Sequence, residues 1–147
     1  MKNFKRLLME TQTDREILIR KAEAAIILRK REARNNFWAY CLYMDPKFFA
    51  KRPFLRLVAE AFMRVFVAYS NNVIYRLAVS MPPRAGKSYI TSLFISWMFG
   101  HFPEESVMRN TCADPLYNKL SYDTRDIIRS RKYKEVFPEI KLRSDKQ

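Results

Sequence analysis

Hydrophobic residues recur at three- and four-residue steps along several stretches of the chain, and this spacing predicts amphipathic helices. The predicted helices cover residues 13–33, 37–43, 54–69, 89–99 and 116–130. The first of them mixes apolar positions with many Lys and Arg residues. Two interpretations of this basic helix stay open: its charged face is merely solvated, or it contacts DNA or a neighbouring subunit.

Two further apolar runs, residues 75–79 and 106–112, have strand character. With the helices that follow them, they give the order strand, loop, helix, strand, helix, which is the opening βαβ unit of a nucleotide-binding sheet. The sequence therefore predicts an α/β fold of the P-loop NTPase type, with parallel strands and a preceding N-terminal helical region. The predicted ATPase core is incomplete.

Local signals predict where several helices begin and end. Asn35 or Asn36 is a suitable N-cap for the aromatic helix 37–43. Asp45-Pro46 should end that helix and lead into a basic loop over residues 47–52. Pro53 is suited to the first turn of the next helix, where its missing N–H costs little.

The chain contains only two glycines, Gly86 and Gly100. Gly86 lies in the loop before helix 89–99, and Gly100 follows that helix. We expect Gly100 to end the helix in the left-handed conformation that glycine adopts easily. The single histidine, His101, should then be a solvated turn residue.

Composition limits the kind of protein. The 147 residues are 48% hydrophobic, which suits one domain with a real core. We expect a basic N-terminal helix over residues 1–34, the nucleotide-binding part over 35–142 and a frayed tail over 143–147. The formal net charge of +13 favours a polyanionic partner, either nucleic acid or an anionic membrane surface.

The chain has too few metal- and disulfide-forming residues for a metal-binding or disulfide-linked protein. Cys41 and Cys112 have no paired spacing, and with His101 they cannot form a metal site. No stretch approaches about 18 uninterrupted apolar residues, and no apolar region follows the basic start. The sequence predicts reduced thiols, a cytosolic location, no signal peptide and no membrane span.

The stretch Ser80-Met81-Pro82-Pro83-Arg84-Ala85-Gly86-Lys87-Ser88 carries the candidate chemistry. A loop between a strand and a helix that ends in Gly-Lys-Ser is typical of a phosphate-binding (Walker A) loop, although Met81 occupies the position of its first glycine. Gly86 would let the backbone approach the phosphates, and Lys87 would neutralise their charge. Ser88 would bind Mg²⁺, and Arg84 would supply a further cation.

This loop resembles the variant phosphate loop of tailed-bacteriophage terminase large subunits, in which the first glycine is often missing and an arginine lies within the loop. The resemblance extends over roughly residues 35–142. It implies ATP and Mg²⁺ as cofactors, Arg84 and Lys87 as catalytic residues, and Ser88 as the Mg²⁺ ligand. The implied ATP-binding residues are Pro83, Arg84, Ala85, Gly86, Lys87, Ser88 and Tyr89.

The resemblance also implies a role in viral genome packaging. Terminase large subunits are ATP hydrolases that drive double-stranded DNA into procapsids in the host cytoplasm. They work as oligomers with a small terminase subunit and a portal protein. No apolar run ending in Asp-Glu follows Ser88, and no acidic nuclease segment is present. We therefore expect ATP binding with turnover near background, from an N-terminal piece of a longer or split protein or from a prophage relic.

Two other functions stay open. The first is a non-catalytic basic module that binds DNA or protein and keeps only a vestigial phosphate loop. The second is a fragment of a helicase-like or chromosome-partition ATPase. Residues 29–34, 47–52 and 129–134 are the basic segments that could contact DNA.

Overall fold

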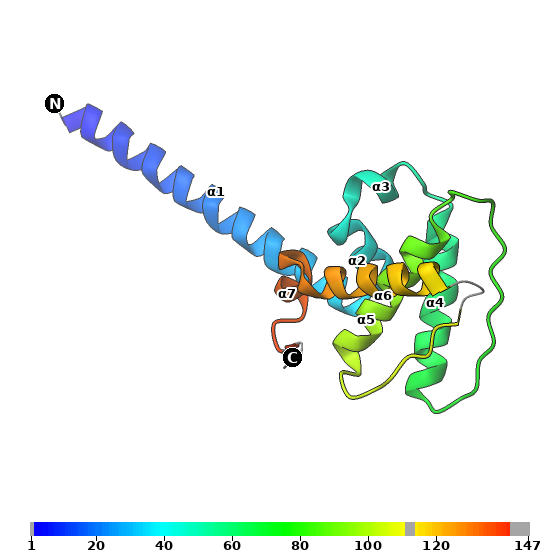
Figure 1. The fold of residues 1–147 in the computed structure, drawn as a ribbon. Coiled ribbons are helices and arrows are strands. Elements are labelled where there is room, and N and C mark those ends of the chain that lie inside the picture. The colour runs from blue at the N-terminus through cyan, green and yellow to red at the C-terminus, as the bar shows by residue number, and fades with distance from the viewer. Residues whose placement is uncertain (1, 111–113, 142–147) are drawn as a thin grey trace.

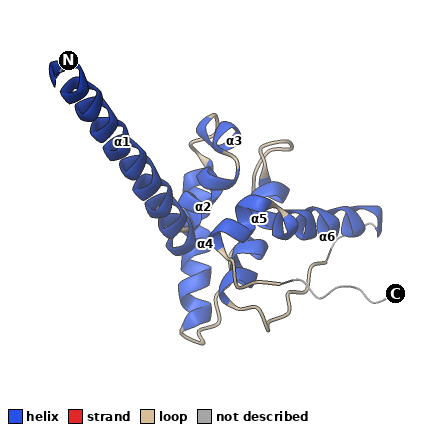
Figure 2. Cartoon of the chain, turned by 90° about the vertical axis from the view of Figure 1, so that its left-hand side faces the viewer, coloured by secondary structure: helices blue, strands red, loops and turns tan. Residues whose placement is uncertain are grey.

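The computed structural model describes residues 2–110 and 114–141, and over these residues the chain is all-α (Figure 1). Its helices are α1 (Lys2–Asn35), α2 (Phe37–Met44), α3 (Pro46–Ala50), α4 (Leu55–Ser70), α5 (Lys87–His101), α6 (Asp114–Arg129) and α7 (Arg131–Val136). Helices α2 to α7 form a body around α5, and α1 extends away from that body (Figure 1). The described residues contain no strand (Figure 2).

The prediction of an α/β fold with parallel strands is therefore wrong. Residues 75–79 and 106–110 are extended but pair with no neighbouring strand, and residues 111–112 lie outside the described part of the chain. The first segment keeps the period of a strand, since Leu77 and Val79 are half-buried while Arg76 and Ala78 are exposed. An alternating apolar pattern is not enough for a strand, because a sheet also needs a partner for the backbone N–H and C=O groups.

The predicted helices all exist, and the starts of α2 and α3 follow local chemistry. The prediction that Pro53 lies in the first turn of a helix is wrong, since α4 begins at Leu55 after the N-cap Phe54. Asn36 is the N-cap of α2, because its Oδ1 accepts a hydrogen bond from the Ala39 N–H at 3.0 Å. Asp45 caps α3 in the same way, through the Phe48 N–H, and Pro46 occupies the first turn. The basic loop predicted over residues 47–52 is therefore mostly helical, since this cap starts a new helix at Pro46.

Aromatic side chains fill the core around α5. Trp97 is fully buried and donates from Nε1 to the Ala33 carbonyl at 3.0 Å, which fixes the end of α1 to α5. Phe37 and Tyr40 of α2 lie against the same region, and Tyr133 of α7 donates to the Ser96 carbonyl at 3.0 Å. Each such side chain contributes about 1.5–3 kcal/mol when fully buried.

The predicted helix end at Gly100 is also wrong. Gly100 lies inside α5, which continues to His101, and it does not have a positive φ. A Cβ at this position would lie 2.5 Å from the Phe137 ring, so glycine is needed there for close packing.

His101 is half-buried instead of being a solvated turn residue. Its Nε2 donates to the Arg34 carbonyl at 2.9 Å, and its ring lies edge-on to Trp97 and Phe137. Burial is the main cause that lowers the pKa of His101.

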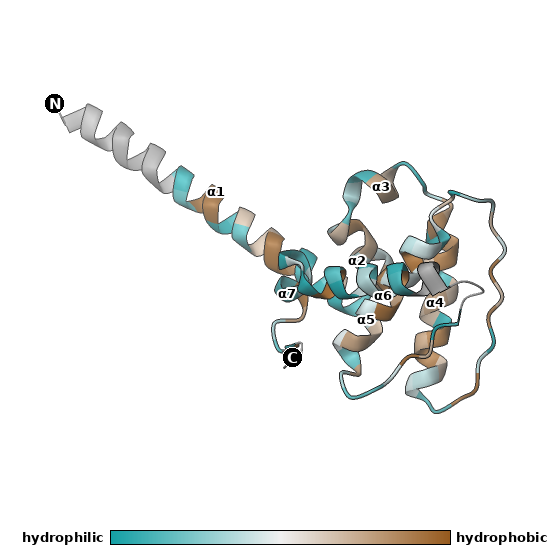
Figure 3. Cartoon of the chain, in the orientation of Figure 1, coloured by the Kyte–Doolittle hydropathy of each residue, from teal (hydrophilic) through white to brown (hydrophobic). Residues whose placement is uncertain are grey.

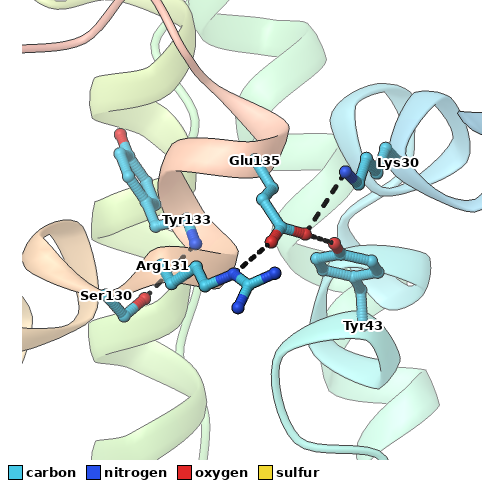
Figure 4. Close-up of polar contacts among 6 residues, drawn as sticks. All are labelled: Lys30, Tyr43, Ser130, Arg131, Tyr133 and Glu135. Carbon is cyan, nitrogen blue, oxygen red and sulfur yellow. Dashed lines mark hydrogen bonds and ion pairs between the residues drawn. The ribbon is translucent and has the colours of Figure 1, made fainter. Parts of the chain in front are cut away.

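A carboxylate on α7 ties three helices together (Figure 4). Glu135 accepts from the Tyr43 hydroxyl at 2.6 Å and from Arg131 Nε at 2.9 Å, and it lies 3.3 Å from Lys30 Nζ. A second ion pair, Arg34–Glu139, joins the end of α1 to the segment after α7.

Two other sequence predictions concern the thiols and the membrane. Cys41 is buried, and this burial raises the pKa of its thiol. Cys112 lies outside the described residues. Over the described ranges, no helix combines the length and the apolar character that crossing a membrane requires.

Candidate functional site

The candidate loop leads directly into the N-terminus of α5. Two of its residues have positive φ angles, Arg84 at 62° and Gly86 at 102°. Gly86 occupies the N-cap position of α5 in the left-handed conformation. This conformation suits glycine and strains residues with a Cβ, so the sequence requirement for glycine at position 86 has a backbone cause.

The first turn of α5 presents backbone donors toward solvent. The earliest intrahelical bond runs from the Ile90 N–H to the Gly86 carbonyl at 3.0 Å. The N–H groups of the preceding residues, Lys87 to Tyr89, belong to the orphan donors at a helix start, where the helix dipole is positive. Thr91 Oγ1 donates to the Lys87 carbonyl and leaves these donors untouched.

Three of the predicted site residues have polar side chains that reach solvent. Arg84, Lys87 and Ser88 are exposed, and within the described part of the chain none of these side chains makes a hydrogen bond or ion pair. Pro83 is also exposed, whereas Ala85 and Gly86 are half-buried. The loop thus brings two cations and a hydroxyl to the positive end of α5, an arrangement that suits an anion.

Helix α3 packs against the loop at Gly86. A Cβ on Gly86 would lie 2.8 Å from Phe48 Cζ and 3.5 Å from Leu55 Cδ1. The Arg52 guanidinium lies over the Phe48 ring, 4.0 Å from its centroid. The sequence analysis missed Phe48 and Leu55 because their role depends on a contact between segments more than 30 residues apart in the chain.

Tyr89 has a packing role in this structure. Its ring packs edge-on against Phe48 at 5.1 Å and stacks on Phe49 at 5.9 Å between centroids. Burial, and then the nearby Asp45 carboxylate, raise the pKa of Tyr89 to about 12, so its phenol is neutral at physiological pH. It therefore anchors the first turn of α5 to α3.

The described residues provide no cluster of acidic side chains at the loop that could hold a metal ion. No cluster of three or more His, Cys, Asp or Glu side chains that could hold a metal occurs in residues 14–110 and 118–141, whose side chains the structure describes. The nearby carboxylate of Asp45 already caps α3. Ser88 is the one residue predicted as a Mg²⁺ ligand, so most ligands would have to come from nucleotide phosphates and water.

Comparison of the chain with protein families, curated proteins and solved structures finds no match. The resemblance to terminase large subunits therefore stays a prediction from the motif.

Proposed function

We propose that the chain binds the phosphates of Mg²⁺-ATP at residues 83–88, and that it provides the ATP-binding N-terminal part of a DNA-packaging motor like the terminase large subunit. The observation that carries this proposal is the left-handed Gly86 at the start of α5, with exposed Lys87 and Ser88 in the first turn. Backbone donors, a helix dipole and a lysine at one helix end are the elements that recognise phosphate.

Each side chain has a distinct role in this proposal. The Lys87 ammonium pairs with the β- and γ-phosphates as a point charge. Ser88 offers its hydroxyl to Mg²⁺ that arrives with the nucleotide, and Arg84 adds a cation to the loop, which has no acidic side chain in residues 80–88. Since the described residues hold no acidic cluster beside the loop, the proposal concerns binding, and we expect turnover by the chain alone to stay near background.

Titration of a fluorescent ATP analogue into the full chain, with and without Mg²⁺, tests this proposal. Lys87→Ala should weaken binding at least tenfold, which corresponds to about 1.4 kcal/mol. Lys21→Ala is the matched control, because Lys21 is an equally exposed lysine on α1. Equal affinity in the wild type and Lys87→Ala would rule out the site.

A second function, binding of double-stranded DNA without any nucleotide, is favoured by the charge on α1. Arg20, Lys21 and Arg31 are exposed, and no ion pair within the described residues neutralises them. Cations that are free of internal partners can pair with DNA phosphates and release counterions. This function corresponds to a basic module whose phosphate loop is vestigial.

A further inference from the structure

Helix α1 exposes large apolar side chains to solvent along much of its length. All side chains from residue 14 to residue 29 are exposed. Six large apolar side chains are among them, with exposed fractions from 44% to 66%: Ile17, Leu18, Ile19, Ile26, Ile27 and Leu28. They form two apolar bands along the helix where it extends from the body (Figure 3). Apolar bands of this kind mark an interaction surface.

Five of the exposed residues lie on one side of the helix. Leu18, Ile19, Ala22, Ala25 and Ile26 recur at steps of three, four and seven, and we call them the arm stripe. Ala33 is seven residues beyond Ile26 on the same side, and it is completely buried in the body. The arm stripe therefore continues a face that is already packed at its C-terminal end.

The arm stripe also leads into a groove at the base of α1. This cavity of about 520 Å³ is lined by Ile26, Arg29 and Glu32 of α1 together with residues after α1. Those residues are Ala39, Leu42, Tyr43 and Pro46. An occupant that covers both the stripe and the groove has to be elongated and apolar along one side, as an amphipathic helix is.

We propose that α1 of a second copy of this chain covers the arm stripe. Of the helices that the structure describes, α1 is the longest, at 34 residues, and its own stripe has the required apolar face. Two identical stripes related by a two-fold axis are self-complementary. Ala22 and Ala25, in the middle of the stripe, allow two helices to approach closely.

The chemistry of the arm disfavours other occupants. DNA offers no aliphatic surface for Leu18, Ile19 and Ile26, so DNA bound to the cations of α1 would leave the arm stripe uncovered. A second arm offers both aliphatic side chains and charges of both signs, because Asp14, Glu16, Glu23 and Glu32 alternate with Lys and Arg residues.

Sedimentation velocity of the full chain over a range of concentrations tests the proposal. The wild type should dimerise, and Ile19→Ser with Ile26→Ser should raise the dimer dissociation constant at least tenfold. The matched control is Ile17→Ser with Ile27→Ser, which removes two exposed isoleucines outside the stripe and should change the dissociation constant less. Circular dichroism verifies that both variants keep their helices. A wild type that stays monomeric, or equal effects of the two pairs, would overturn the proposal.

Cysteine cross-linking gives a second, independent measurement. Ala22→Cys lies on the arm stripe, and Ala24→Cys lies on the other side of the helix. Both alanines are exposed. A disulfide forms only when the two Cα atoms are about 4.4–6.8 Å apart. We expect a covalent dimer under mild oxidation with Ala22→Cys and much less with Ala24→Cys, while the wild type reports the background from the native cysteines. Equal cross-linking at both positions would contradict a contact through the stripe.

Discussion

The two glycines of the chain are required for different physical reasons. Gly86 has a φ of 102°, so its backbone conformation excludes most residues that carry a Cβ. Gly100 has ordinary helical geometry. A larger residue would not fit there, because the Phe137 ring occupies the place of a Cβ. In an exposed helix, a glycine is about 1 kcal/mol less favourable than alanine. The two positions should therefore respond differently to substitution.

Gly100→Ala should lower the free energy of unfolding by about 1–2 kcal/mol, despite the better helix propensity of alanine. The new methyl group would lie 2.5 Å from the Phe137 ring, and overpacking of this kind costs about 1–3 kcal/mol. Urea denaturation followed by circular dichroism measures the change. In a Phe137→Leu background the same substitution should be neutral or stabilising. A stabilised Gly100→Ala in the wild-type background would show that the ring moves aside at little cost.

At the scale of the element, the Glu135 carboxylate links the short helix α7 to α1 and α2, in addition to the buried contacts of Tyr133 and Val136. The Tyr43 hydroxyl, then Arg131 and Lys30, hold the pKa of Glu135 at about 2, well below its ordinary value (Figure 4). A carboxylate with a lowered pKa in the folded state stabilises the fold above its unfolded-state pKa. This contribution is lost as the pH falls through the folded-state pKa. Attachment of α7 to α1 and α2 should therefore weaken in acid.

Glu135→Gln tests this attachment through the pH dependence of Tm. The variant should melt below the wild type at pH 7, and the difference should narrow below pH 4.5 and disappear only below pH 2, where the wild-type carboxylate becomes protonated. Glu60→Gln is the control, since Glu60 forms an exposed pair with Arg56 four residues before it on α4. Exposed pairs of this type contribute little. A difference in Tm that does not depend on pH would assign the role of Glu135 to packing.

The sequence predicts the elements better than their assembly. Helices could be located because capping and apolar spacing are local signals, as Asn36 and Asp45 illustrate. The predicted strands were wrong, because pairing depends on a distant neighbour that residues 75–79 do not find among the described residues. His101 was misplaced because its partners, Arg34 and Phe137, are remote in the sequence.

For the candidate site, the motif indicated the residues of the loop but not the residues that pack against it. The motif located the exposed residues Lys87 and Ser88 and the required glycine at position 86. It did not indicate that Phe48 of α3 supports Gly86 or that Tyr89 packs against α3, because these contacts exist only in the folded chain. The residues that could touch a ligand were thus predictable, and the residues that hold them in place were not.

At the scale of the whole molecule, the two proposed functions use the net charge of +13 in different ways. Several acidic residues are already used in ion pairs on the body, namely Glu60, Glu135 and Glu139. Exposed cations on α1 and the loop cations Arg84 and Lys87 remain for external anions. Phosphate binding at the loop needs Lys87 in one position, whereas DNA binding through α1 depends on the number of cations along the helix.

Binding to double-stranded DNA should therefore weaken steeply with salt, and fluorescence anisotropy of a labelled duplex measures this. Replacing Arg20, Lys21 and Arg31 by alanine should reduce the slope of log K against log salt by about 2.7, at about 0.9 per phosphate contact. The control replaces Arg64, Lys119 and Lys141, which removes the same charge from exposed positions outside α1. Equal slopes for the two triple variants would mean that α1 makes no specific contribution. Mg²⁺-ATP should alter the wild-type affinity for DNA if the chain belongs to a motor, and it should have no effect if the phosphate loop is vestigial.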